Sequence, residues 1–346
     1  MTTVGGESRF VADVLDEYGT RVRAAMTDYL KPREPRRYLY NLVSDYPRRG
    51  GRMLRPSLCL ATARAFGASD DDALKTAVAI ELLHNAFLVH DDVEDESDTR
   101  RGRPTLNALH GSPIAVNVGD ALFFMGLKAL LDNAGELGVT LTMSVLTEAE
   151  RMLQETVEGQ SIELGWRRDN AIHLRETDYL QMIMKKTCWY TTIFPLRAGA
   201  LIGSRSELDL DRFVRFGFFA GAAFQIEDDL LNLTGDPVKY GKELNGDIQE
   251  GKRTLMLIHL LEHASAEERA RVSDILGRPR HMRTADEVTW IRDRMDAHHS
   301  IEYSERVAHG LAGAAQHAFD EAFAAVPSSR DRLFLEGVVR WVLSRS

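Results

Sequence analysis

The sequence predicts an all-α protein, a single large helical bundle, on three observations. Apolar residues recur every three or four positions over long stretches, and runs that alternate apolar and polar residues are scarce, which is typical of helices rather than strands. Capping-box sequences at residues 265–268 and 284–287 mark two helix starts. Glycine and proline cluster between the periodic stretches, where helices are expected to end.

The helical stretches follow one another along the chain. The pattern is clearest at residues 73–89, 121–131, 139–164, 208–233 and 301–323. The main breaks are expected at residues 47–51, 101–104, 111–113, 235–251 and 277–279. Because we find no linker composition, low-complexity tract or repeat, we expect residues 1–346 to form one domain.

Composition excludes some classes of function. The 346 residues carry a formal net charge of −9, which disfavours binding to nucleic acid. Cys59 and Cys188 are far apart in apolar surroundings and are expected to be buried, reduced thiols. The first residues lack the basic and apolar regions of a signal peptide, and no uninterrupted apolar run approaches the ~18 residues of a membrane helix. We therefore expect a cytoplasmic protein that does not span a membrane.

Two predicted helices are apolar nearly all round, as expected for the middle of a bundle, and both end in acidic clusters. The first cluster runs from Asp91 to Asp95. Asp91 and Asp95 share one helix face, with about 6 Å of axial rise between them, and like charges this close repel. At the end of a buried helix the repulsion must be offset, which a divalent cation would do.

The second cluster, residues 227–232, has the same spacing, because Asp228 and Asn232 share a face. Carboxylates and carboxamides are hard oxygen ligands that suit magnesium. One such cluster alone is more typical of a solvated acidic helix end than of a metal site, but two with one spacing, each closing an apolar helix, favour a metal site. Because magnesium sites built from few carboxylates complete their shell with phosphates and water, a diphosphate substrate is expected.

Basic residues that suit a diphosphate occur near both clusters. Arg52 and Arg55 follow a glycine pair with i, i+3 spacing, and arginine forks match phosphate oxygens. The others lie just after the first cluster, inside an apolar helix and in a glycine-rich acidic loop: Arg100, Arg101, Arg103, Lys185, Lys186, Lys242 and Lys252. Each signal is weak alone, but together with the acidic clusters they indicate a diphosphate site.

With these residues, the chain resembles the trans-type isoprenyl (polyprenyl) diphosphate synthases, most of all the geranylgeranyl diphosphate synthases. The family's motifs appear in order between about residues 50 and 260. They are G-G-K-x-x-R-P at 50–56, with Arg52 for lysine; D-D-x-x-D and R-R-G-x-P at 91–104; G-Q at 159–160; K-T at 186–187; F-Q-I-x-D-D-x-x-D at 224–232, with Asn232 for the last aspartate; and G-K with G-D-x-x-E-G-K-x-T-L at 241–255.

The resemblance implies a helical bundle of the isoprenoid synthase type around a central apolar cavity. It implies a homodimeric prenyltransferase that condenses isopentenyl diphosphate with dimethylallyl, geranyl or farnesyl diphosphate. The cofactor would be Mg²⁺, or Mn²⁺ in its place, with roughly three ions per site. The implied metal ligands are Asp91, Asp95 and Asp228, with Asp92 and Asp229 supporting them.

The resemblance also assigns the substrate contacts. Arg100, Lys186 and Lys242 would bind the allylic diphosphate, and Lys252 would join the substrate-binding residues. Thr187 and Gln225 would face the developing allylic cation. Isopentenyl diphosphate would be bound by Arg52, Arg55, His84 and Arg101, of which His84 alone would pass for a core histidine.

In this family, product length is set by side chains below the first aspartate motif, here Phe87, Ala86 and Leu83. One bulky and one small residue nearest the motif indicate geranylgeranyl diphosphate as the product. Two alternatives are a terpene cyclase on the same scaffold and a non-catalytic subunit of a heteromeric synthase. Retention of the isopentenyl diphosphate residues argues against the first, and two competent aspartate motifs argue against the second.

Overall fold

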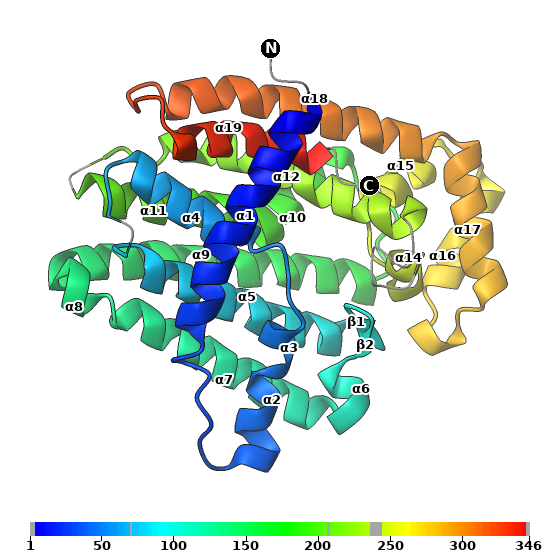
Figure 1. Ribbon diagram of the computed structural model, residues 1–346. Coiled ribbons are helices and arrows are strands. Elements are labelled where there is room, and N and C mark those ends of the chain that lie inside the picture. The colour runs from blue at the N-terminus through cyan, green and yellow to red at the C-terminus, as the bar shows by residue number, and fades with distance from the viewer. Residues whose placement is uncertain (1–3, 70, 206–207, 236–243, 344–346) are drawn as a thin grey trace.

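The computed structural model describes residues 4–69, 71–205, 208–235 and 244–343, which form an all-helical bundle with one two-residue-wide ribbon, β1 paired antiparallel with β2 (Figure 1). This confirms the predicted fold class. The elements are α1 (Val4–Met26), η1 (Arg36–Tyr40), α2 (Asn41–Val43), α3 (Asp45–Arg48), α4 (Leu54–Ala65), α5 (Leu74–Glu94), β1 (Thr99–Arg100), β2 (Arg103–Pro104), α6 (Leu106–His110), α7 (Ser112–Leu131), α8 (Ala134–Leu137), α9 (Val139–Arg168), α10 (Glu176–Ile183), η2 (Met184–Ile193), α11 (Phe194–Ser204), α12 (Arg212–Thr234), α14 (Gly246–Glu250), α15 (Leu255–His263), α16 (Ala266–Leu276), η3 (Arg280–Met282), α17 (Ala285–Ala297), α18 (Ser300–Ala322) and α19 (Arg330–Leu343).

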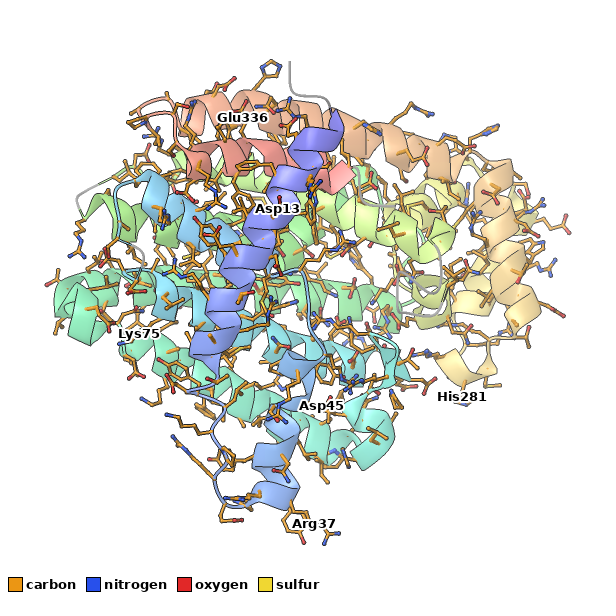
Figure 2. All side chains as sticks on the ribbon, viewed as in Figure 1. Asp13, Arg37, Asp45, Lys75, His281 and Glu336 are labelled. Atoms are coloured by element: carbon orange, nitrogen blue, oxygen red, sulfur yellow. The ribbon has the colours of Figure 1, made fainter. Side chains whose placement is uncertain are left out.

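The two helices that precede the acidic clusters lie inside the bundle. Helix α5 packs on α7 and α4, and α12 packs on α18 and η2 (Figure 1). Most residues of α5 and α12 are buried, from both faces of each helix. The surface is charged, and Figure 2 shows Arg37 at the tip of the projection formed by η1 and α2, and His281 at the tip before α17. The two acidic clusters are therefore carried by core elements.

Most predicted stretches are confirmed, with shifted ends. Both capping boxes form, since Ser265 Oγ accepts from the backbone N of Glu268 at 3.2 Å and Thr284 Oγ1 from that of Glu287 at 3.3 Å. The expected break at 111–113 is where α7 begins, with Pro113 in its first turn, a position that proline tolerates. Helix α5 continues past Val89 through the acidic cluster to Glu94.

Two further sequence expectations can be compared with the structure. Cys59 and Cys188 are free and buried. One stretch, Ser112–Leu137, is long and apolar enough to cross a membrane by composition, with a mean hydropathy of 1.6, although the uninterrupted-run criterion did not select it. Of its most apolar window, 39% is buried inside the protein, and a core helix of a bundle passes the same test.

Candidate active site

A cavity of about 1140 Å³ lies between α4, α5, α9, η2 and α12. Its wall combines apolar side chains such as Leu88, Phe123 and Ile183 with charged ones. Most of the predicted site residues line it: Arg52, Arg55, His84, Phe87, Asp91, Arg100, Arg101, Lys186, Thr187, Gln225, Asp228 and Lys252. Leu83, Ala86, Asp92 and Asp95 are buried and do not line it, and Lys242 lies outside the described residues.

The first acidic cluster is held by arginine and tyrosine from outside α5. Arg100 Nε donates to Asp92 Oδ1 at 2.8 Å, and Arg100 Nη2 lies 3.2 Å from Asp91 Oδ2. The hydroxyl of Tyr46 also donates to Asp92, which is fully buried. Burial acts to lower the pKa of Arg100, but Asp92 and Asp91 outweigh it and raise that pKa. The R-R-G-x-P motif thus neutralises the end of α5.

Asp95 is only 1% exposed and is enclosed by two cations. Arg167 Nη1 of α9 donates to its Oδ1 at 2.5 Å, and Lys252 Nζ lies 2.6 Å from its Oδ2. Lys252 also pairs with Glu250 at 2.8 Å. Burial, reinforced by the nearby Asp91 carboxylate, raises the pKa of Asp95 to about 7. The two cations 2.5 and 2.6 Å away favour its charged form.

Lys186 connects the first cluster to α9. Its Nζ lies 3.4 Å from Asp91 Oδ1 and also donates to Glu163. Lys186 and Thr187 lie in η2, a π-helical segment inside a longer helical run, and π-turns are frequent at functional sites. A Cβ at Gly159 would overlap the backbone of Lys186, so the G-Q motif lets α9 approach η2 closely.

A chain of hydrogen bonds joins η2 to the second cluster. Thr187 Oγ1 donates to Gln225 Oε1 at 3.0 Å, and Gln225 Nε2 donates to Asp229 Oδ1 at 2.7 Å. Tyr179 donates its hydroxyl to Asp229 Oδ2 at 2.9 Å. Burial, followed by the Asp247 carboxylate, raises the pKa of Asp229 to about 8. Asp228, the residue before Asp229 in α12, also lines the cavity.

Asn232, which departs from the family motif, is hydrogen-bonded to residues at the start of α14. Its Oδ1 accepts from the backbone N of Asp247 at 3.1 Å, and its carbonyl accepts from the backbone N of Asn245 at 2.9 Å. The side chain is buried and does not line the main cavity. An amide here joins the end of α12 to Asn245 and Asp247 at the start of α14 rather than facing the cavity.

Arg55, His84 and Arg101 gather at another part of the cavity wall. Arg55 Nη2 donates to Tyr190 Oη at 3.0 Å, and its guanidinium lies 4.5 Å from the Tyr190 ring centroid. Arg55 Nη1 is 3.5 Å from His84 Nε2. Burial, followed by Arg55 and Arg101, lowers the pKa of His84 well below its usual value, so the imidazole is neutral. Arg101 lies against Gly51, where a Cβ would be 2.9 Å from its Nη2.

The donor set can be tested for its fit to a metal. Across residues 4–69, 71–205, 208–235 and 244–343, no three histidine, cysteine, aspartate or glutamate side chains stand close enough to hold an ion by themselves. Asp91 and Asp228 nevertheless line one cavity, and both offer the hard oxygens that Mg²⁺ prefers. Because Mg²⁺ usually takes only one or two carboxylates and completes its shell with phosphates and water, the residues fit it.

Several residues around this cavity were missed by sequence reasoning. Tyr179 and Trp341 line it, and Arg167 pairs with the buried Asp95 nearby, but all three belong to none of the motifs. Their sequence distances from their partners are long, for example 72 residues between Asp95 and Arg167. Only a buried tyrosine within an apolar helix hinted at a polar partner, since a buried phenol usually requires one.

Comparisons with known proteins all identify the same family. The family model described as polyprenyl synthetase matches residues 36–295. A short-chain isoprenyl diphosphate synthase from Methanothermobacter thermautotrophicus is 34% identical over 271 residues, covering 77% of this chain and 80% of the relative. The octaprenyl diphosphate synthase of Escherichia coli is 30% identical over 302 residues, with 87% and 85% covered.

Solved structures agree with these matches. Geranylgeranyl pyrophosphate synthetase from Pyrococcus horikoshii superposes with a TM-score of 0.84 at 29% identity, covering 98% of this chain and 99% of that one. A polyprenyl synthase from Caulobacter crescentus, solved in complex with calcium and isoprenyl diphosphate, also gives 0.84, at 26% identity and 98% coverage of both chains. Both of these synthases therefore share this fold.

Proposed function

The chain belongs to the polyprenyl synthetase family, and we propose that it condenses isopentenyl diphosphate with an allylic diphosphate to give a trans-prenyl diphosphate. The observation that carries the proposal is the cavity itself. Its wall brings together aspartates from two helices, two groups of cations and an apolar surface, which are the features needed to release a pyrophosphate and to shelter a carbocation.

The allylic diphosphate would lie between α5 and α12. Mg²⁺ held by Asp91 and Asp228, or Mn²⁺ in its place, would stabilise the negative charge on the leaving pyrophosphate. Asp95, the third ligand that the resemblance implies, is enclosed by Arg167 and Lys252 and would join them only if those ion pairs opened. Arg100 and Lys186 line the same part of the cavity and would add positive charge as the allylic C–O bond breaks. Because both side chains already lie beside Asp91, at 3.2 and 3.4 Å, the diphosphate would exchange with existing ion pairs.

The allylic cation would face polar oxygens and apolar walls. Thr187 and Gln225 line the cavity, and the Gln225 amide is oriented by its bonds to Thr187 and Asp229. Their oxygen dipoles would stabilise positive charge, while the apolar walls keep water from the cation. Isopentenyl diphosphate, held by Arg52, Arg55 and Arg101 beside neutral His84, would attack with its double bond. The new C–C bond forms, and the released pyrophosphate would accept the proton that is lost.

Geranylgeranyl diphosphate is the product that the proposal names. Phe87 supports a limited tunnel, because it lines the cavity below Asp91 and its ring meets that of Tyr190 edge-on, with centroids 5.5 Å apart. Leu83 instead packs on α7, where a Cβ at Gly126 would lie 2.8 Å from its Cγ. We therefore expect Phe87 to affect product length more than Leu83 or Ala86.

The test is the product profile of the purified chain with Mg²⁺, labelled isopentenyl diphosphate and each of the three allylic diphosphates. We expect a twenty-carbon prenyl diphosphate, and no product without isopentenyl diphosphate or after chelation of the metal. A main product of forty carbons or more would contradict the chain length. A hydrocarbon formed from the allylic substrate alone would indicate a terpene cyclase instead.

A homodimer is the second part of the proposal. Large apolar side chains on α7 and α9 face solvent: Phe124, Leu131, Val139, Met143 and Val157, with Phe124 69% exposed. Helices α7 and α9 pack on each other, and a second copy would cover these exposed apolar side chains. Light scattering should give twice the mass of one chain, and Phe124→Glu should give a monomer. A monomeric wild type would contradict this part alone.

A further inference from the structure

The last helix, α19, reaches the cavity beside the glycine-rich turn before α4. Trp341, near its end, lines the cavity together with Arg52 and Arg55. The Arg52 guanidinium carbon lies 5.3 Å from the centroid of the Trp341 ring, within the range of a cation–π interaction. We propose that Trp341 is a positioning residue, whose ring holds Arg52 in place to bind the diphosphate of isopentenyl diphosphate. This rests on the proposed function.

The position of Arg52 makes an aromatic neighbour useful in orienting its side chain. It is exposed, and it follows Gly50 and Gly51 and precedes Met53, three residues with φ values of 83°, 156° and 53°. An exposed arginine has many rotamers, and fixing it to bind a ligand costs conformational entropy. The turn fixes the direction in which the Arg52 side chain leaves the backbone. Contacts with neighbouring side chains then decide which rotamer it adopts.

The other arginines of this group each have a fixed support. Arg55 is stacked on Tyr190 at 4.5 Å and lies 5.9 Å from the Phe224 ring centroid. Arg101 lies against the backbone of Gly51. Trp341 supports Arg52 as Tyr190 supports Arg55, and a guanidinium stacked on a ring can still direct its N–H edge toward a phosphate.

Trp341 is itself held firmly, because α19 is fixed to α1 and α4. Asp331 accepts a hydrogen bond from Arg64 Nε of α4 at 3.1 Å and another from the Tyr18 hydroxyl of α1. Gly337 lies against Val11, where a Cβ would be 3.0 Å from Val11 Cγ2. The same helix, α4, therefore carries Arg55 and packs on α19 (Figure 1), which fixes the helix that bears the Trp341 ring relative to Arg55.

A purely structural role for Trp341 is the competing explanation, and kinetics separate the two. The variants are Trp341→Leu and Trp341→Phe, with Trp290→Leu as the matched control, because Arg271 stacks on Trp290 at 4.0 Å and Trp290 does not line the cavity. KM for each substrate, kcat and the thermal unfolding temperature would be measured for all three. We predict that loss of the Trp341 ring affects KM for isopentenyl diphosphate and not KM for the allylic diphosphate.

We expect Trp341→Leu to raise KM for isopentenyl diphosphate about two- to fivefold, the factor that corresponds to an exposed cation–π contact. KM for the allylic diphosphate and kcat should change by less than that. Trp341→Phe should fall between wild type and Trp341→Leu, and Trp290→Leu should match wild type. In an Arg52→Gln background, Trp341→Leu should add no further rise, because the supported cation is gone.

Two results would overturn the inference. One is an unchanged KM for isopentenyl diphosphate in Trp341→Leu, and the other is an equal rise in both KM values that persists in the Arg52→Gln background. If Trp341→Leu does not fold, Trp341→Phe carries the same comparison. Failure of the wild type to consume isopentenyl diphosphate would instead overturn the proposed function, and this inference with it.

Discussion

The buried carboxylates Asp95 and Asp229 each have at least one donor from another helix or segment. Asp95 has Arg167 and Lys252, and Asp229 has Gln225 and Tyr179. This pairing follows from the high cost of burying a charge without a partner. Asp95 is therefore paired with cations, whereas the donors to Asp229 are neutral.

Tyr179→Phe tests this matching at a single residue. The change removes one hydrogen bond to a buried carboxyl group and leaves the ring packing intact, so it should lower the free energy of unfolding by about 1–2 kcal/mol. Urea denaturation of both proteins would measure the difference. Tyr38→Phe is the control, because Tyr38 is 63% exposed. A Tyr179→Phe protein as stable as wild type would contradict the role given to this bond.

Sequence reasoning reached part of this residue-level picture. It selected Asp91, Asp228, Arg55 and Lys186, because charged residues at the ends of apolar helices are unusual and because the motifs match a known family. It missed Arg167 and Trp341, which look like ordinary helix residues. Their importance comes from which helices are neighbours, and local spacing carries no signal for that.

At the scale of elements, the segment η2 differs most from expectation. The end of α5 follows the expectation that the acidic cluster is helical down to Glu94, although acidic residues at a helix C-terminus oppose the helix dipole. Arg100, Lys186 and Lys252 supply the compensating charge. The π-helical winding of η2 spans only ten residues, too few for its different period to show in the sequence.

Gly159→Ala tests the close approach of α9 to η2. A Cβ at this position would overlap the backbone of Lys186, so the helices would have to separate. Overpacking of this kind should lower the free energy of unfolding by about 1–3 kcal/mol and should reduce turnover, because Lys186 and Thr187 would shift. Chemical denaturation and a product assay would measure both effects.

Gly310→Ala is the control for that substitution. It also replaces a helical glycine, but a Cβ there would meet nothing within 4 Å, so it should leave stability unchanged or raise it by up to about 1 kcal/mol. Equal effects of the two substitutions would show that helix propensity, rather than the contact with η2, determines the outcome at Gly159.

The capping box of α16 should give the protein a pH-dependent stability. The backbone N–H of Ser265, and next its side chain, lower the pKa of Glu268 to about 2, from an ordinary value of 4.5. A carboxyl whose pKa is lower in the folded state stabilises the fold above its ordinary pKa and loses that effect as the pH falls through the folded value. The stability difference between wild type and Glu268→Gln should therefore be full above pH 4.5 and shrink toward pH 2.

Thermal unfolding of both proteins across this range measures the difference, and Glu267→Gln, one residue away in the same helical turn, is the control. A difference that does not change with pH would contradict the assignment to the Glu268 carboxylate.

The whole molecule places opposite charges together inside an acidic protein. The chain has a net charge of −9, yet its main cavity is lined by two groups of cations and by acids from α5 and α12. Composition disfavours a large polyanion as a partner, but it says nothing of a small one. The fold class was predictable from helical periodicity, and the convergence of the two acidic helix ends was predicted by resemblance, because the order of helices in space depends on packing between distant segments.

The central claim is that carboxylates on two separate helices act as one unit on one pyrophosphate. A double-mutant cycle on Asp91→Asn and Asp228→Asn, with Asp169→Asn as an exposed control, tests it through kcat for the condensation. We expect each single change to lower kcat by about 10² or more, and the double variant to lose much less than the product of the two factors. Losses that multiply fully, or near-wild-type turnover of either single variant, would contradict the account.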